Sequence, residues 1–176
     1  MSRLLHLNGP PGIGKSTLAR RYADDHPGVL VCDIDVLRTF LGGWREDFAR
    51  AGALIRPTAL AMITAHLREG YDVVLPQLLL DPAERDRFRA SATDVGASYD
   101  ERLLLDTPDA VVARFHRRGD SADDPWHDQV RAIVADQGGD DLLRDYDRRL
   151  RSLDAPVVTS VEGDLEATYA ALVRSL

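Results

Sequence analysis

The feature that most constrains this chain is a glycine-rich segment near its start, residues 9–17, with the sequence GPPGIGKST. It matches the pattern G-x-x-x-x-G-K-S, follows a short apolar run at 3–8, and leads into a segment with helical spacing from Ser16. Its glycines allow backbone conformations that a Cβ would forbid, so successive N–H groups can point inward around phosphate oxygens. The segment therefore predicts a phosphate-binding loop between a strand and a helix, where the positive end of the helix adds to the attraction.

Three side chains of this segment suggest how a nucleotide would be held. Lys15 is placed to reach the β- and γ-phosphates, the Ser16 hydroxyl to bind Mg²⁺, and Thr17 to contact the α-phosphate. A plain turn would not need three glycines and a lysine together. We therefore predict that ATP and Mg²⁺ bind here, with Ser16 as the metal ligand. The predicted nucleotide-binding residues are Gly9, Pro10, Pro11, Gly12, Ile13, Gly14, Lys15, Ser16 and Thr17.

Strand and helix patterns alternate along the rest of the chain. This alternation predicts an α/β fold with a five-stranded parallel sheet and helices on both faces. The expected strands cover residues 3–8, 29–32, 72–77, 98–105 and 156–159. The main expected helices cover residues 16–25, 36–41, 57–69, 81–93, 106–117, 126–135, 140–153 and 164–176.

The segment before the third strand is harder to interpret. Residues 44–56 are expected to be helical with a break near Gly52. Pro57 suits the first turn of a helix that ends near Glu69, because its missing N–H would be unpaired there in any case. Gly70 is expected to end that helix.

Bulk properties limit the choice of function. A length of 176 residues suits one domain, residues 1–176, and no linker or repeat interrupts it. The net charge of −7 argues against long nucleic acid as the main partner. The single cysteine, Cys32, excludes an internal disulfide. No stretch approaches the roughly 20 apolar residues of a membrane span, so we expect a cytoplasmic protein. We further expect it to be a monomer or a homodimer.

Four segments resemble the small P-loop kinases of the nucleoside-monophosphate-kinase type. They resemble most the kinase domain of polynucleotide 5′-hydroxyl kinases, chloramphenicol phosphotransferase and the tunicamycin-resistance ATP-binding proteins. The resemblance implies a three-layer P-loop NTPase sandwich with a helical lid at about 114–137. The segments are residues 9–17 (GPPGIGKST), 26–38 (HPGVLVCDIDVLR), 80–85 (LDPAER) and 114–119 (RFHRRG).

Two aspartates follow the second strand. Ligands of such sheets bind beyond the carboxyl ends of the strands. A carboxylate there can accept a proton from a hydroxyl, hold Mg²⁺ through water, or simply cap the next helix. The resemblance implies that Asp35 is the general base and that Arg38 contacts an acceptor phosphate or the transition state. Asp33 remains the alternative base.

Arginines gather where the predicted lid begins. Arg114 and Arg118 are four residues apart and share a helix face, with Arg117 beside them. Guanidinium groups suit the spread negative charge of phosphoryl transfer, and the resemblance implies lid arginines over ATP, led by Arg114 and Arg118. A solvated basic helix end is the alternative interpretation. The polar run 119–125 is expected to be a flexible loop.

The third strand departs from the family pattern. Many P-loop enzymes end this strand with an aspartate that steadies Mg²⁺, whereas here it ends with Pro76-Gln77. Gln77 carries no charge and could hold a neutral acceptor. Asp81 is better explained as a helix N-cap than as a replacement for that acid.

The leading functional hypothesis is a kinase that moves the γ-phosphoryl group of ATP to a hydroxyl of a small molecule, such as a nucleotide, a sugar or an antibiotic. Lys15, Asp35, Arg38, Arg114 and Arg118 are the candidate catalytic residues. A polynucleotide 5′-hydroxyl kinase and a non-catalytic ATP-binding resistance protein that sequesters a ligand are the alternatives. A GTPase switch is disfavoured because the sequence has no N-K-x-D element.

Overall fold

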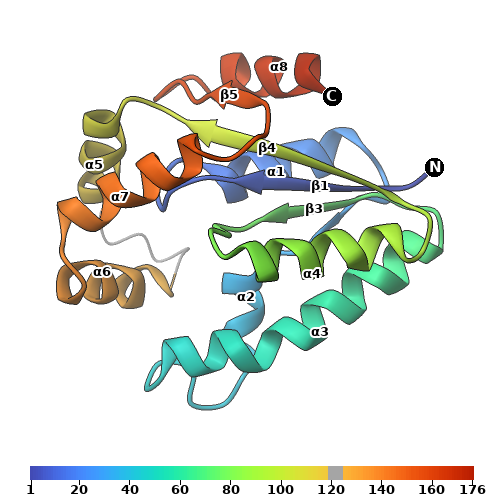
Figure 1. Cartoon of the computed structure of the whole chain (residues 1–176), viewed down its shortest axis with the longest axis horizontal. Coiled ribbons are helices and arrows are strands. Elements are labelled where there is room, and N and C mark those ends of the chain that lie inside the picture. Colours follow the sequence, from blue (N-terminus) through green and yellow to red (C-terminus); the bar gives the residue numbers. More distant parts are fainter. Residues whose placement is uncertain (119–124) are drawn as a thin grey trace.

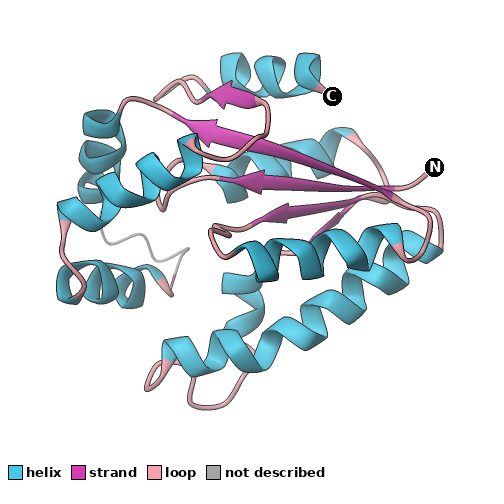
Figure 2. Ribbon diagram, viewed as in Figure 1, coloured by secondary structure: helices cyan, strands magenta, loops and turns pink. Residues whose placement is uncertain are grey.

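The structure, a computed structural model, describes residues 1–118 and 125–176 and places five strands of these residues in one parallel sheet (Figures 1 and 2). The spatial order is β2-β3-β1-β4-β5, so β1 lies at the centre. This confirms the predicted α/β fold of the P-loop NTPase class. The strands are β1 Arg3–Asn8, β2 Leu30–Val31, β3 Val73–Pro76, β4 Ser98–Leu105 and β5 Val157–Thr159.

Helices cover both faces of the sheet. Figure 1 shows α3 and α4 side by side along one face, while α5, α6 and α7 gather near the end where the strand arrows point. In the described ranges, no helix combines the length and the apolar character of a membrane span. The helices are α1 Lys15–Asp25, α2 Ile34–Arg38, α3 Phe48–Arg68, α4 Pro82–Thr93, α5 Pro108–Arg117, α6 His127–Asp136, α7 Asp140–Arg151 and α8 Leu165–Ser175.

The central strand shows why both faces are covered. Successive side chains of a strand point to opposite faces. Leu4 therefore packs in the core cluster of α3 and α4, whereas Leu5 and Leu7 pack in the cluster of α1 and α8. All three side chains are at most 1% exposed. An apolar run that is buried on both sides is typical of a parallel sheet between two helical layers.

Helix α3 corrects the expected boundary at Pro57. The helix begins at Phe48, nine residues before the proline, and passes through it. Its buried face runs through Ile55, Ala59 and Ile63, and burial of these side chains outweighs the roughly 3 kcal/mol that an internal proline costs. Pro57 itself is exposed, so the carbonyl that lacks its N–H partner can bond to water.

The expected break near Gly52 is also absent. Gly52 is buried in the middle of α3, and a Cβ at this position would lie 2.8 Å from Cζ of Arg38. Glycine is therefore needed here because the Arg38 side chain packs against the helix, and not because the chain turns. Gly70, in contrast, follows the end of α3 with φ of 90°, as expected.

The short helix α2 starts earlier than predicted. It begins at Ile34 because Asp33 accepts hydrogen bonds from the backbone N–H groups of Asp35 and Val36, at 3.1 and 3.4 Å. This is an N-cap, the alternative role considered for these aspartates. Of the predicted loop 119–125, residues 119–124 lie outside the described residues.

Polar side chains of β1 form a buried network on the α4 side of the sheet. Asn8 donates to the Leu79 carbonyl and to Oε1 of Glu101, both at 2.9 Å, and accepts from the Leu79 N–H at 3.1 Å. Arg85 of α4 donates to Glu101 at 2.5 Å, and Nδ1 of His6 lies 3.4 Å from the same carboxylate. The network therefore fixes the loop after β3 to the strand that enters the glycine-rich segment.

Glu101 should make folding stability depend on pH. Burial acts to raise its pKa, but hydrogen bonds from His6, Arg85 and Asn8 outweigh burial and lower the pKa from 4.5 to about 2. A lowered folded-state pKa stabilises the protein above the unfolded-state pKa, and this contribution is lost as pH falls toward 2. We predict that the stability difference between wild type and Glu101→Gln shrinks by roughly 3 kcal/mol between pH 5 and pH 2.

Urea unfolding at a series of pH values measures this difference. Glu69→Gln, at an exposed glutamate, serves as the control and should follow the wild type throughout. A constant gap between wild type and Glu101→Gln over this pH range would contradict the prediction.

Candidate functional site

The glycine-rich loop (residues 9–14) joins the end of β1 to the start of α1. A Cβ at Gly9 would lie 2.6 Å from the Leu104 carbonyl oxygen, so the loop can approach β4 only with glycine at this position. Gly14 has φ of 99°, in the left-handed region that favours glycine, and directly precedes α1. The predicted strand-loop-helix arrangement is therefore present.

The Lys15 ammonium group is held at the mouth of this loop. Nζ donates to the carbonyls of Gly9 and Pro10, both at 2.8 Å. Burial lowers the pKa of Lys15 to about 8, although Asp35 and Asp33 act in the opposite direction. A desolvated ammonium beside a ring of N–H groups can exchange its carbonyl partners for phosphate oxygens.

The two aspartates after β2 occupy different positions. Asp33 Oδ2 accepts a hydrogen bond from the Ser16 hydroxyl at 2.7 Å, while Oδ1 caps α2. Hydroxyl and carboxylate oxygens are donors that suit Mg²⁺, so Ser16 with Asp33 beside it fits a metal ligand and its support. Both oxygens of Asp33 already have partners, which favours Asp35 as the group free to act on a substrate.

Asp35 faces the same pocket as Lys15. Its side chain is 28% exposed, and its Oδ1 lies 3.5 Å from Nε of Arg38. Burial raises the pKa of Asp35, with Arg38 acting in the opposite direction. A carboxylate with a raised pKa is suited to accept a proton and to release it later.

An open pocket of about 570 Å³ extends from the glycine-rich loop over the end of the sheet. This volume is within the usual range of small-molecule sites. The end of α5, the start of α6 and the loop after β5 complete its walls. The residues outside the glycine-rich loop include Lys15, Ser16, Thr17, Asp35, Pro76, Arg114, Arg117, Arg118, Trp126, His127, Ser160, Glu162 and Thr168.

Arg114 lines this pocket but is tied to the protein. Its guanidinium donates to Asp106 at 2.5 Å, and to Oγ and the carbonyl of Ser160 at 2.9 and 3.0 Å. Ser160 in turn donates to the Ile13 carbonyl at 3.1 Å. The side chain is 8% exposed. These contacts give Arg114 a clear structural role in joining α5 and the loop after β5 to the glycine-rich loop.

The other two arginines of the predicted lid differ from Arg114. Arg117 is exposed and pairs with Glu162 at 2.5 Å. Arg118 is half-buried in the pocket wall, and burial lowers its pKa while Asp33 and Asp35 act in the opposite direction. Arg118 therefore lies within electrostatic reach of the aspartates, which suits it better than Arg117 to stabilise charge on a phosphate.

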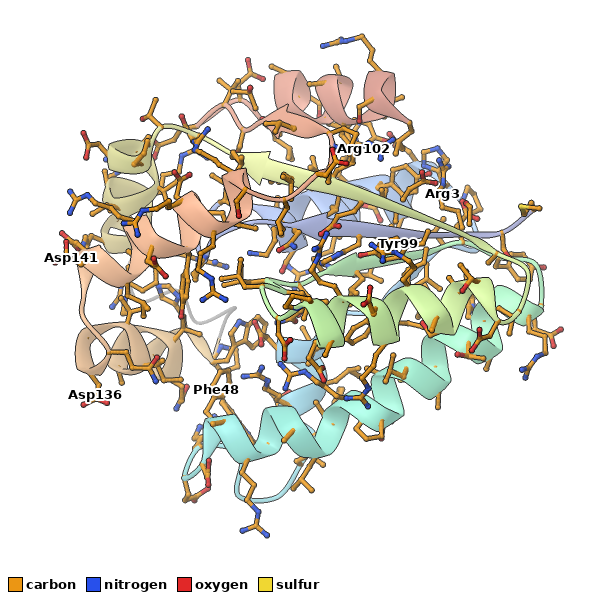
Figure 3. The ribbon with its side chains drawn as sticks, in the orientation of Figure 1. Arg3, Phe48, Tyr99, Arg102, Asp136 and Asp141 are labelled. Carbon is orange, nitrogen blue, oxygen red and sulfur yellow. The ribbon has the colours of Figure 1, made fainter. Side chains whose placement is uncertain are left out.

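Arg38 is 8% exposed and lies beside α3. Its Cζ is 4.1 Å from the ring centre of Phe48 (labelled in Figure 3), and its flat guanidinium packs against Gly52. The sequence predicted correctly that Arg38 lies near Asp35, but it gave no role to Phe48 and interpreted Gly52 as a break in the helix. The unusual glycine inside a helical pattern was the signal that could have indicated this close packing.

An aromatic cluster connects the two sides of the pocket. Trp44 and Phe48, before and at the start of α3, pack in one buried cluster with Trp126, which precedes α6. Trp126 and His127 also line the pocket. The start of α3 and the segment of the predicted lid before α6 are therefore in contact through these rings.

This sheet, with a glycine-rich loop after its central strand and a lysine at the start of α1, defines a P-loop protein of the α/β class. A family model described as an AAA domain matches residues 4–137, well over half of the chain. The chain belongs to this AAA-domain family.

The chain is also similar to individual known proteins. An adenylate kinase of Deinococcus radiodurans is 33% identical over 127 residues, which cover 65% of this chain and 63% of that protein, less than two thirds of its length. A tunicamycin resistance protein of Deinococcus radiodurans has a TM-score of 0.60 at 17% identity, covering 99% of this chain and 96% of that one. A gluconokinase from Sinorhizobium meliloti 1021 has a TM-score of 0.59 at 19% identity, covering 99% and 93%. These two structures share the fold.

The contacts of Arg114 predict a large loss of stability on its removal. Arg114→Ala leaves the Asp106 carboxylate half-buried without its cation, and Ser160 without its donor. We expect the free energy of unfolding to fall by about 3 kcal/mol. Arg117→Ala breaks only an exposed pair and should cost less than about 1 kcal/mol. Urea unfolding of both variants tests this, and equal losses would contradict the structural role of Arg114.

Proposed function

We propose that this protein is an ATP-dependent kinase that transfers the γ-phosphoryl group of ATP to a hydroxyl of a small molecule. One observation carries the proposal: Lys15, at the mouth of the glycine-rich loop, and Asp35, a partly exposed carboxylate, line the same pocket. A cation for the phosphates and a base for the hydroxyl are the two groups that such a transfer requires.

In the proposed complex, the backbone N–H groups of residues 12–17 surround the phosphates of ATP. Lys15 leaves the carbonyls of Gly9 and Pro10 to contact the β- and γ-phosphates. Ser16 would hold Mg²⁺ with Asp33 as its support, and the bound ion would supply positive charge to the phosphates. Arg118 is the lid arginine that we place near the γ-phosphate, because Asp33 and Asp35 lie within its electrostatic reach.

The proposed transfer replaces one phosphorus–oxygen bond with another. The acceptor hydroxyl oxygen bonds to the γ-phosphorus, the bond from this phosphorus to the bridging oxygen of ADP breaks, and the hydroxyl proton passes to Asp35. Lys15 and Arg118 stabilise the negative charge that spreads over the phosphoryl oxygens. Asp35 later returns its proton to water.

The raised pKa of Asp35 and its place in the pocket predict a specific defect in Asp35→Asn. Turnover should fall by about 10²-fold or more, while the affinity for ATP stays within about twofold. Asp24→Asn, at an exposed position of α1, is the matched control and should keep full turnover. The measurements are transfer of labelled phosphate from ATP across a panel of small hydroxyl compounds and calorimetric binding of ATP. A non-catalytic ATP-binding protein would show no transfer in either form.

The lowered pKa of Lys15 predicts that the affinity for nucleotide depends on pH. The nucleotide-free protein loses the Lys15 proton above its pKa of about 8, whereas bound phosphates favour the charged form. Each pH unit above 8 should therefore weaken MgADP binding by up to about tenfold. Lys15→Arg keeps its charge, so its affinity should stay constant from pH 8 to pH 10. Calorimetric titrations measure both proteins, and parallel pH profiles would contradict the prediction.

A further inference from the structure

The backbone carbonyl of Arg118 is held by a neighbouring helix. Arg118 directly follows α5, and the last carbonyls of a helix have no N–H partner within that helix. Here Nε2 of His127 lies 3.0 Å from the Arg118 carbonyl oxygen, and the Arg131 guanidinium donates to the same oxygen. Both groups come from α6, where a spacing of four residues places them on one face. Helix α6 therefore caps the end of α5.

The imidazole ring of His127 is fixed in place. His127 is the first residue of α6 and is 7% exposed. Its ring meets the buried Phe115 ring edge-on, with the ring centres 5.7 Å apart. A carbonyl oxygen only accepts hydrogen bonds, so Nε2 carries a hydrogen atom. Burial, together with the charges of Arg118 and Arg131, lowers the pKa of His127, so the ring is neutral at pH 7.

The contact with α6 sets the direction of the Arg118 side chain. On one side of its Cα, the N–H group of Arg118 donates to the Arg114 carbonyl at 3.0 Å. On the other side, its carbonyl is held by His127 and Arg131. Because peptide groups are planar, fixing both of them also fixes the bond from Cα to Cβ. Arg118 and His127 both line the pocket, so the fixed side chain starts from the pocket wall.

Capping alone does not explain His127. One donor satisfies a helix carbonyl, and Arg131 already supplies one to this oxygen. The second donor is a buried polar ring, and burial of a polar group is unfavourable unless it makes a defined hydrogen bond. Two donors from different positions of α6 use both lone pairs of the oxygen and restrict the peptide group more than one donor would.

We propose that His127 is a positioning residue: its Nε2–H group holds the Arg118 backbone so that the Arg118 guanidinium stays directed at the γ-phosphate of ATP. The inference rests on the proposed kinase function and adds a residue to it. In this role His127 acts through Arg118 and need not contact either substrate. Its loss should therefore affect the transfer step and leave the binding of ADP and of the acceptor unchanged.

Three substitutions of His127 separate its hydrogen bond from its ring. His127→Phe keeps a ring against Phe115 but removes the donor, and we expect kcat to fall by roughly tenfold or more with the acceptor KM within about twofold. His127→Gln places an amide N–H where Nε2 was and should recover most of the lost kcat. The shorter amide of His127→Asn cannot reach the carbonyl and should resemble His127→Phe.

A matched histidine on the surface provides the control. His116 also meets the Phe115 ring edge-on, but its side chain is 61% exposed and pairs with Asp140. His116→Phe should therefore keep the turnover of the wild type. If His127→Phe does not fold, the comparison of His127→Gln with His127→Asn decides, since these two differ only in the reach of the same amide.

A double-mutant cycle tests whether His127 acts through Arg118. In an Arg118→Ala background, His127→Phe should lower kcat no further, because the side chain that His127 directs is gone. A further loss of the same size as in the wild-type background would overturn the proposal while leaving the kinase function intact. Loss of kcat that His127→Gln does not restore would also overturn it.

Nucleotide binding gives a measure that does not depend on transfer. AMP-PNP keeps a γ-phosphoryl group but does not transfer it, whereas ADP lacks this group. Calorimetry should show that His127→Phe and Arg118→Ala each weaken MgAMP-PNP about fivefold or more and change MgADP less than about twofold. His127→Gln should bind both nucleotides as the wild type does.

This result would support the positioning role even if no compound were phosphorylated and the kinase function failed. Unchanged MgAMP-PNP binding in His127→Phe would overturn the proposal. A loss of affinity shared equally by MgADP would assign His127 to the fold alone and would overturn it as well.

Discussion

The Asp33 carboxylate holds the two halves of the site together. One oxygen accepts the hydroxyl of Ser16, at the start of α1, and the other caps α2. The proposed nucleotide side and the proposed acceptor side are therefore both positioned by one short side chain after β2. Without this carboxylate, α2 would lose its cap, and Asp35 and Arg38 would lose the backbone that aims them. In the proposed function, the glycine-rich loop would then bind ATP without an acceptor placed beside it.

The charges of the site fall into two groups with different physical roles. Arg114 has three hydrogen bonds to the protein and joins α5 to the loop after β5. Lys15, Arg38 and Arg118 are desolvated, and burial lowers the pKa of each. Cations held partly out of water can bind phosphate oxygens strongly, because little water screens their charge. The fold itself positions these cations, and α3 contributes because Gly52 leaves room for the Arg38 guanidinium.

Local patterns explain how much the sequence alone could predict. The segment 3–25, strand β4 and the Asp81 cap follow from short-range chemistry, and all three were predicted correctly. The start of α3 was wrong because a long buried face overrides Pro57, and local propensity does not include that burial. The electrostatic influence of Arg56 on Asp35 was not predicted, because it arises only from the packing of α2 on α3. The sequence left the roles of Asp33 and Asp35 open, because two positions so close together do not reveal which carboxylate turns toward Ser16.

The aromatic cluster has a consequence for observing the molecule. The chain contains two tryptophans, Trp44 and Trp126, and both lie in this one cluster, one shortly before α3 and the other directly before α6. The two residues are 6% and 8% exposed, so both indole rings fluoresce from an apolar environment when α3 and α6 are in contact. Any separation of these helices admits water to both rings at once. The intrinsic tryptophan fluorescence of the protein therefore reports on the separation of α3 and α6.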